Sequence, residues 1–172
     1  MNKTSGGIIL VTGGARSGKS AIAEARALSF APRATYIATA EARDSEMTAR
    51  IAAHQARRGD NWRTHAEPLD LTGALVATDR QGPRLVDCLT LWLTNLMLGG
   101  HDWQAAGRAL VAALPAQVDP VVLVTNEVGA GIVPDNALAR EFRDAAGVLN
   151  QWVAAVADEV TLAVAGLPLK VK

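Results

Sequence analysis

The stretch Gly13-Gly14-Ala15-Arg16-Ser17-Gly18-Lys19-Ser20 decides the fold of this 172-residue chain, because it fits the pattern G-x-x-x-x-G-K-[ST]. The apolar run at 8–12 before it predicts a buried strand, and residues 19–30 after it predict a helix. In such a unit the glycines allow a tight turn, so that backbone amides and the helix N-terminus point at phosphate oxygens. The stretch therefore predicts a binding loop for a nucleoside triphosphate rather than an ordinary glycine-rich turn.

Four side chains are candidates for the chemistry of the phosphates. Lys19 is placed to reach the β- and γ-phosphates, and the Ser20 hydroxyl to bind Mg²⁺. Asp87 ends an apolar strand, where a carboxylate that holds Mg²⁺ or its water would lie, although an acid at a strand end is also a common cap. Glu127 follows another apolar strand and is either a base, a carboxylate near the metal, or a solvated loop residue.

Strand and helix patterns alternate along the whole chain. Strands are expected at 8–12, 34–39, 62–67, 84–87, 121–125 and 159–165, with a short edge at 169–171, and helices at 19–30, 44–58, 69–77, 89–98, 103–114 and 135–156. This alternation predicts a single α/β domain over residues 1–172, with a mainly parallel sheet and helices on both faces. Ligands of such sheets bind at the carboxyl ends of the strands, where the phosphate loop lies.

The composition excludes several classes of function. Lysine plus arginine and aspartate plus glutamate each number 17, so no net charge draws the chain to nucleic acid or to a membrane surface. The apolar runs are short and interrupted, so none is expected to span a bilayer. A single cysteine, Cys88, excludes an intrachain disulfide and a multi-cysteine metal site. We expect a cytoplasmic protein with a reduced thiol.

The helix expected at 44–58 carries a histidine among arginines. Met47, Ile51 and His54 recur at i, i+4 and i+7, which places His54 along or beside a buried stripe. One interpretation is a partly buried histidine that bonds to a backbone group. The other is a nucleophile that attacks phosphorus, because nearby guanidinium groups favour the neutral imidazole and would also hold a triphosphate. The guanidinium groups in question belong to Arg50, Arg57 and Arg58.

The chain resembles the bifunctional adenosylcobinamide kinase / adenosylcobinamide-phosphate guanylyltransferase family of cobalamin biosynthesis, over essentially its whole length. The Asn-Glu-Val-Gly run and the spacing from His54 to Trp-Arg-Thr make the match specific. The matching residues beyond the phosphate loop are 37–40, Arg50-Ile51 with His54, 62–64, 87–92, 125–129, 131–134, 142–144 and Leu169-Lys170.

This resemblance implies two reactions at one site region. The first phosphorylates adenosylcobinamide with GTP or ATP. The second forms a guanylylated histidine from GTP with release of pyrophosphate, and then passes GMP to adenosylcobinamide phosphate to give adenosylcobinamide-GDP. The resemblance also implies a RecA-like sheet of the P-loop class and a homotrimer.

The resemblance further assigns residues of the site. The guanylylated histidine corresponds to His54; some relatives carry two adjacent histidines, whereas this chain has Ala53-His54. Relatives often have two glutamates before the proline, whereas this chain has Ala66-Glu67-Pro68. The implied nucleotide contacts are the loop residues 13–20, Ala38, Thr39, Ala40, Gln55, Ala56, Arg57, Arg58, Glu67 and Asp87.

Two simpler functions are alternatives. A monofunctional kinase of a small alcohol would use the same loop and would form no covalent nucleotide. A GTPase switch would need the guanine-specifying tetrapeptide [NT]-K-x-D, which does not occur in the sequence.

Overall fold

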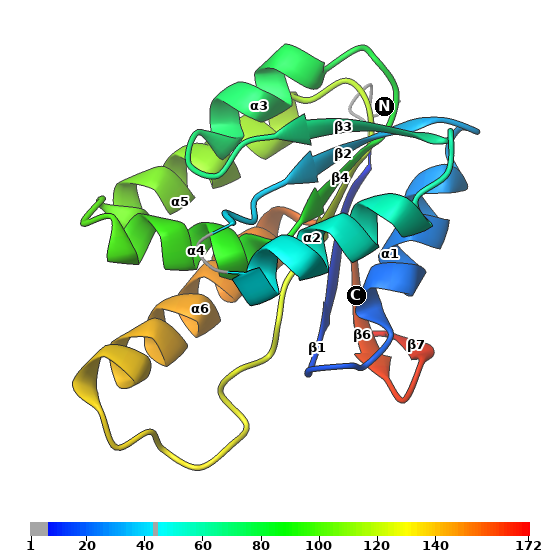
Figure 1. The fold of residues 1–172 in the computed structure, drawn as a ribbon. Helices are drawn as coiled ribbons and strands as arrows, with labels where there is room; N and C mark the ends of the chain where they lie inside the picture. Colours follow the sequence, from blue (N-terminus) through cyan, green and yellow to red (C-terminus); the bar gives the residue numbers. More distant parts are fainter. Residues whose placement is uncertain (1–6, 43–44) are drawn as a thin grey trace.

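The computed structural model describes residues 7–42 and 45–172 (Figure 1). The strands are β1 (Ile8–Gly13), β2 (Ala34–Ala38), β3 (Trp62–Ala66), β4 (Arg84–Asp87), β5 (Val121–Val124), β6 (Glu159–Val164) and β7 (Leu167–Lys170). The helices are α1 (Lys19–Leu28), α2 (Ser45–Arg57), α3 (Leu71–Thr78), α4 (Leu89–Leu98), α5 (Trp103–Ala113), the 3-10 turn η1 (Leu114–Ala116) and α6 (Ala137–Val156). Among these described helices, none has the length and apolar character that a bilayer crossing requires.

The seven strands form one sheet in the order β3-β2-β4-β5-β1-β6-β7. Neighbouring strands from β3 to β6 are all parallel, and only β7 runs antiparallel, as the second strand of a hairpin with β6. Strand β5 lies between β1, which leads into the loop, and β4, which ends at Asp87. The expected mainly parallel sheet is confirmed.

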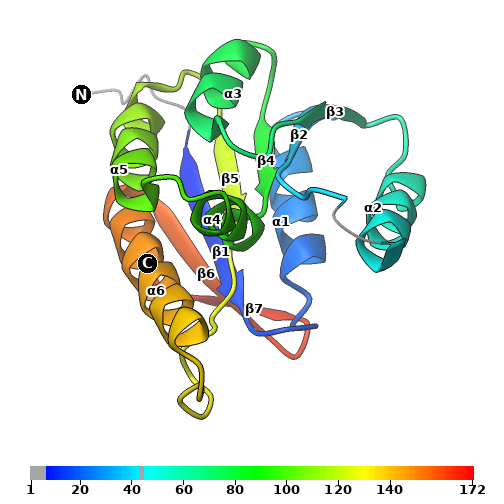
Figure 2. The ribbon, with the colours of Figure 1, turned by 60° about the vertical axis from the view of Figure 1, so that its left-hand side comes forward.

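Helices cover both faces of the sheet, as expected (Figure 2). Successive residues of a strand point to opposite faces, and β1 follows this rule: Ile8 and Leu10 pack under α3, α4, α5 and α6, whereas Ile9 and Val11 pack under α1. Strand β1 is buried along its whole length, which explains its unbroken apolar run.

Several helix boundaries differ from the expected ones, and side-chain caps explain two of them. Helix α6 begins at Ala137, two residues late, because the Asn136 side chain accepts a hydrogen bond from the backbone N–H of Ala139. Helix α3 begins at Leu71, also two residues late, because Asp70 caps it in the same way. A cap of this kind fixes the first turn more sharply than apolar periodicity does.

Helix α2 lies on the α1 side of the sheet but stands apart from it (Figure 2). Of the stripe that the sequence predicted, only the Ile51 side chain is described, and it is half-buried; the other described side chains of α2 are exposed. The apolar pattern of α2 consists largely of alanines, which bury little surface. The side chains of Met47 and His54 lie outside the described part of the structure.

A buried arginine forms hydrogen bonds to several segments at the amino-terminal side of the sheet. Arg84, at the start of β4, is 0% exposed. Its Nη1 donates to the carbonyl of Leu75 and to Oε1 of Gln117, and its Nη2 donates to the carbonyl of Asp119. Its Nη2 also lies 3.0 Å from Oδ1 of Asp79, which completes an ion pair. A buried charge with this many partners serves stability, and it lies at the opposite end of β4 from Asp87.

Asp79 is held as a carboxylate. Burial by itself raises its pKa, but the backbone N–H groups of Asp119 and Val118 and the Arg84 guanidinium lower it by more, so the pKa lies below its ordinary value. Because the folded pKa is lower than the unfolded one, Asp79 stabilises the fold above about pH 4, and this contribution is lost as pH falls through the folded pKa.

We predict that Asp79→Asn lowers the free energy of unfolding at pH 7 by about 3 kcal/mol, because it leaves the buried Arg84 charge without its counter-ion. The measurement is urea unfolding at several pH values, where the difference from wild type should shrink as pH falls from about 5 to about 3. Asp144→Asn is the matched control, since Asp144 pairs with Arg143 at the surface and should cost less than about 1 kcal/mol. A constant difference across the pH range would contradict this account.

Candidate active site

The phosphate loop connects the end of β1 to the first turn of α1, as the sequence predicted. Gly18 has φ of 89°, in the left-handed region, and directly precedes the helix. Lys19 Nζ donates to the carbonyl of Gly14 at 3.0 Å, so its ammonium group lies across the mouth of the loop. The loop and the helix N-terminus therefore form the anion-binding arrangement expected of this motif.

The β6–β7 turn supports the loop from outside. The backbone N–H of Gly166 donates to the carbonyl of Ser17 at 2.9 Å. A Cβ on Gly18 would lie only 2.9 Å from the Cα of Gly166, so the two backbones approach too closely for any side chain between them. The hairpin is therefore part of the loop's scaffold, a role that the sequence did not indicate.

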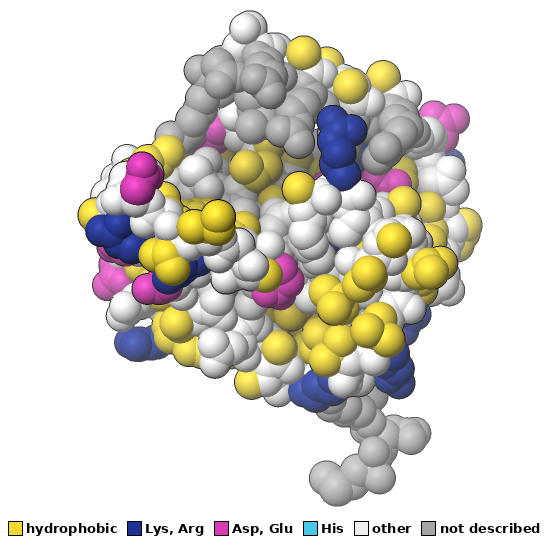
Figure 3. Space-filling view, turned by 90° about the horizontal axis from the view of Figure 1, so that it is seen from below, with side chains coloured by type: hydrophobic (Ala, Val, Ile, Leu, Met, Phe, Trp, Pro, Cys, Tyr) yellow, Lys and Arg dark blue, Asp and Glu magenta, His cyan; other side chains and the backbone are white. Residues whose placement is uncertain are grey.

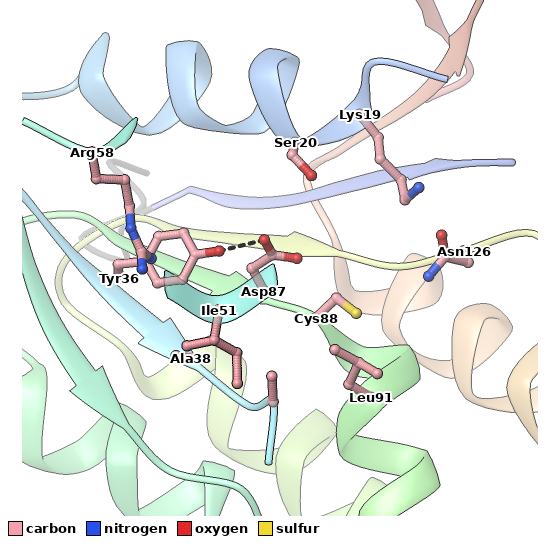
Figure 4. A pocket seen from close by; sticks show the side chains of 11 residues that line it. Lys19, Ser20, Tyr36, Ala38, Ile51, Arg58, Asp87, Cys88, Leu91 and Asn126 are labelled. Atoms are coloured by element: carbon pink, nitrogen blue, oxygen red, sulfur yellow. Dashed lines mark hydrogen bonds between the residues drawn. The ribbon is translucent and has the colours of Figure 1, made fainter. Parts of the chain in front are cut away.

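A cavity of about 320 Å³ opens beside the loop at the carboxyl edge of the sheet. Figure 4 shows its side chains converging from α1, from β2 and β4, from the residues around α2 and from the segment after β5. The cavity is lined by Lys19, Ser20, Tyr36, Ala38, Ala40, Ile51, Arg58, Asp87, Cys88, Leu91 and Asn126. Six of the sequence-predicted residues, Lys19, Ser20, Ala38, Ala40, Arg58 and Asp87, are thus brought together.

Strand register explains why Asp87 reaches this cavity. Asp87 pairs with Ala38 on one side and with Val124 on the other, and Val124 pairs with Val11 of β1. The last residues of β2, β4 and β5 therefore lie level with one another and with Val11 of β1. Asp87 then sits two strands from the phosphate loop, with β5 between them.

Asp87 accepts a hydrogen bond from Tyr36, and the ring of Tyr36 also contacts Arg58. The Tyr36 hydroxyl donates to Oδ2 of Asp87. The Arg58 guanidinium lies over the Tyr36 ring, with its Cζ 3.5 Å from the ring centre. Nε and Nη1 of Arg58 are buried and meet no hydrogen-bond acceptor among the described residues. Buried guanidinium donors without partners are costly, so this end of the cavity is suited to an anion.

The donors at the loop fit a magnesium ion. Ser20 and Asp87 point toward each other across the cavity (Figure 4), and within the described chain Oδ1 of Asp87 has no hydrogen-bond donor. No cluster of three or more His, Cys, Asp or Glu side chains that could hold a metal occurs among the described residues. Mg²⁺ suits such a site, because it usually takes one or two carboxylates and completes its shell with water and substrate phosphates.

The remaining sequence-predicted residues are placed differently. Thr39 is fully buried. Its hydroxyl donates to the carbonyl of Cys88 and accepts from the Cys88 N–H, so Thr39 holds the backbone of a residue that lines the cavity. Oε1 of Glu67 accepts the backbone N–H groups of Leu69 and Asp70, ahead of α3. Nucleotide contacts by Thr39 and Glu67 stay predictions.

Glu127 and Cys88 can be judged from their contacts. Glu127 accepts a hydrogen bond from the Thr12 hydroxyl at 2.6 Å, and its backbone N–H donates to the carbonyl of Gly13, so it ties the segment after β5 to the end of β1. Burial raises the pKa of the Cys88 thiol to about 11, so Cys88 lines the cavity as a neutral group.

The residues of α2 are described only in part. Ala56 is exposed, and the side chains of His54, Gln55, Arg57 and Arg50 lie outside the described part of the structure. Their roles therefore stay predictions.

Sequence reasoning missed several lining residues, of which Tyr36 matters most. A signal was present, because Tyr36 and Ala38 are two residues apart on β2 and so point to the same face. If Ala38 faces the site, the side chain of Tyr36 must face it as well. Asn126, directly after β5, carried a similar signal; its amide and backbone N–H both donate to the Thr90 hydroxyl.

The loop, the sheet order and the cavity define a P-loop nucleotide-binding protein. The family model described as "Cobinamide kinase / cobinamide phosphate guanyltransferase" matches residues 9–171, and the chain belongs to this family.

Curated relatives agree with this assignment. The chain is 47% identical over 166 residues to a "Bifunctional adenosylcobalamin biosynthesis protein CobP" of Pseudomonas aeruginosa, with 95% of this chain and 96% of the relative covered. It is 48% identical over 185 residues to a "Bifunctional adenosylcobalamin biosynthesis protein CobU" of Salmonella typhimurium, with 96% and 99% covered. Among solved structures, that of the RadB recombinase is similar with a TM-score of 0.44 and 12% identity, over 92% of this chain and 74% of that one.

We predict that Gly18→Ala weakens nucleotide binding by about 10-fold or more, equivalent to about 1.4 kcal/mol, because the new methyl group would push the loop away from Gly166. The measurement is calorimetric titration with a non-hydrolysable GTP analogue. Gly166→Ala is the matched control: Gly166 also has positive φ, but a Cβ there meets nothing within 4 Å. Equal losses in the two variants would show that backbone strain, and not the close approach, governs the loop.

Proposed function

We propose that this chain catalyses both reactions that its family is named for, with the corrinoid substrate in its adenosyl form. In the first, the terminal hydroxyl oxygen of adenosylcobinamide attacks the γ-phosphorus of GTP or ATP. The bond from that phosphorus to the β-bridging oxygen breaks, the nucleoside diphosphate leaves, and the hydroxyl proton is lost. The observation that carries the proposal is the convergence of Lys19, Ser20 and Asp87 on one cavity beside the phosphate loop.

The roles of these residues follow from where charge develops. The loop amides and Lys19 would stabilise the negative charge on the transferring phosphoryl group. Ser20 and Asp87 would hold Mg²⁺, directly or through water, and the ion would neutralise the β- and γ-oxygens. Phosphoryl transfer of this kind needs positioning and charge stabilisation more than covalent chemistry, which suits a cavity that offers a loop, a lysine and one carboxylate.

The second reaction would use His54. Its imidazole nitrogen attacks the α-phosphorus of GTP, pyrophosphate leaves, and GMP remains on nitrogen as a phosphoramidate. A phosphate oxygen of adenosylcobinamide phosphate then attacks the same phosphorus, the P–N bond breaks, and adenosylcobinamide-GDP forms while the imidazole is restored. No electron acceptor or donor is needed in either step.

Two described residues on either side of His54 support this assignment. Ile51 lies three positions before it, and Arg58 lies four positions after it; both line the cavity. Residues spaced by three share a helix face, so position 54 falls on the side of α2 that carries Ile51, and Arg58 directly follows the end of the helix. The unpartnered donors of Arg58 would then bind a phosphate of the nucleotide close to that face.

The proposal includes the homotrimer that the family resemblance implied and the cytoplasmic location expected from the composition. Exposed apolar side chains support self-association. Val164, Leu167, Leu169 and Val171, in and after the β6–β7 hairpin, are each more than half exposed. Figure 3, which views the molecule from the end where β1 and β6 finish, shows hydrophobic side chains gathered on this face. Contiguous apolar surface of this kind is typical of protein interfaces.

We predict that GTP with a radioactive α-phosphate labels the wild-type chain covalently, whereas GTP labelled at the γ-phosphate does not. The label should be lost in acid and retained in base, as expected of a phosphoramidate and unlike a phosphate ester on serine. The measurement is denaturing electrophoresis of the chain after incubation with each nucleotide.

His54→Ala should abolish the label and the guanylyl transfer while sparing phosphorylation of adenosylcobinamide, since that step relies on the loop. His65→Ala, which removes a half-buried histidine of β3, is the control and should still be labelled. Labelling of His54→Ala would assign the nucleophile elsewhere. An unlabelled wild type that still phosphorylates adenosylcobinamide would leave a monofunctional kinase.

A further inference from the structure

Tyr36 is the chain's only tyrosine, and it joins two walls of the cavity. It projects from β2 and is 4% exposed. One contact runs from its hydroxyl to Asp87, and another runs from the face of its ring to the Arg58 guanidinium (Figure 4). A third contact fixes the ring itself: Trp62 of β3 meets it edge-on, with ring centres 5.8 Å apart and planes at 89°.

We infer that Tyr36 is a positioning residue, which orients the Asp87 carboxylate for Mg²⁺ and the Arg58 guanidinium for a nucleotide phosphate. This inference rests on the proposed function, because it assumes that a Mg²⁺–nucleotide complex occupies the cavity. Tyr36 was not among the residues that the family resemblance assigned to the site, and it need not touch the reacting atoms to act in this way.

The Tyr36 hydroxyl bonds to only one of the two carboxylate oxygens of Asp87. Because the Tyr36 hydroxyl occupies Oδ2, the carboxylate is held in one rotational setting and Oδ1 remains for the metal or its water. Groups that hydrogen-bond to a metal-binding carboxylate orient it in this way in many metal sites.

The contact with Arg58 leaves the guanidinium donors free for a ligand. A hydrogen-bonding partner would consume N–H groups, whereas the face of an aromatic ring attracts the cation without using any of them. The donors at Nε and Nη1 accordingly have no acceptor among the described residues. The ring thus holds Arg58 in place and keeps its N–H groups available for a phosphate.

The test separates the hydroxyl from the ring. Tyr36→Phe keeps the ring that carries Arg58 and loses the hydroxyl that holds Asp87. The affinity for a non-hydrolysable GTP analogue is measured by calorimetry with and without Mg²⁺, so that no turnover is needed. In Tyr36→Phe the gain in affinity due to Mg²⁺ should fall by about 10-fold, the lower end of the effect typical of such partners. The affinity without Mg²⁺ should stay within twofold of wild type.

Two further variants tie the effect to Asp87. In an Asp87→Asn background, Tyr36→Phe should cause no additional loss of the Mg²⁺ effect, because the two side chains act as one unit. Trp62→Phe is the matched control: it keeps an aromatic side chain beside the same ring and leaves the Tyr36 hydroxyl in place, so it should leave the Mg²⁺ effect unchanged.

An unchanged Mg²⁺ effect in Tyr36→Phe, or an equal reduction in Trp62→Phe, would overturn the inference while leaving the proposed function intact. Additive losses in the double variant would overturn it as well. A wild-type chain that binds no nucleotide at all would overturn the proposed function and the inference together.

Discussion

The parallel direction of the strands is the constraint on which the site depends. Six strands run the same way, so their carboxyl ends form a single edge, and the register sets Ala38, Asp87, Val124 and Val11 level with one another. The phosphate loop begins two residues beyond Val11 on that edge. Residues separated by more than a hundred positions therefore meet there, as is general for open α/β sheets. No rearrangement of the loops could bring Asp87 to the phosphates if β4 ran the other way.

Arg84 of β4 and Arg58, which follows α2, illustrate the difference between stability and function. Arg84 has acceptors at both of its terminal nitrogens and is paired with Asp79, so that only its Nε lacks a partner among the described residues. Arg58 is held by the face of an aromatic ring, and two of its nitrogens have no described acceptor. A folded chain leaves buried donors unsatisfied only at some cost in free energy. The unpaired donors of Arg58 are therefore consistent with a side chain whose role is to bind a ligand.

Much of the fold could be predicted from the sequence, because β1 and the loop give a strong local signal and because the strands and helices alternate. The pairing of strands could not, since nothing local states that β2 lies beside β4. The role of Tyr36 depends on that pairing, and the support of Gly18 by Gly166 depends on the fold of a hairpin far along the chain. For helix α2 the predicted stripe stays a prediction, since only its Ile51 side chain is described, and Ile51 is half-buried at the cavity.

The central claim is that the loop and Lys19 stabilise the phosphoryl group in transfer. The most direct test is the rate at which Lys19→Ala phosphorylates adenosylcobinamide at saturating nucleotide and Mg²⁺. Lys19 makes its one described hydrogen bond to the carbonyl of Gly14, so the variant should fold normally. The account predicts a loss in kcat of about 100-fold or more, corresponding to about 3 kcal/mol of transition-state stabilisation. A folded Lys19→Ala variant with a near-normal rate would contradict it.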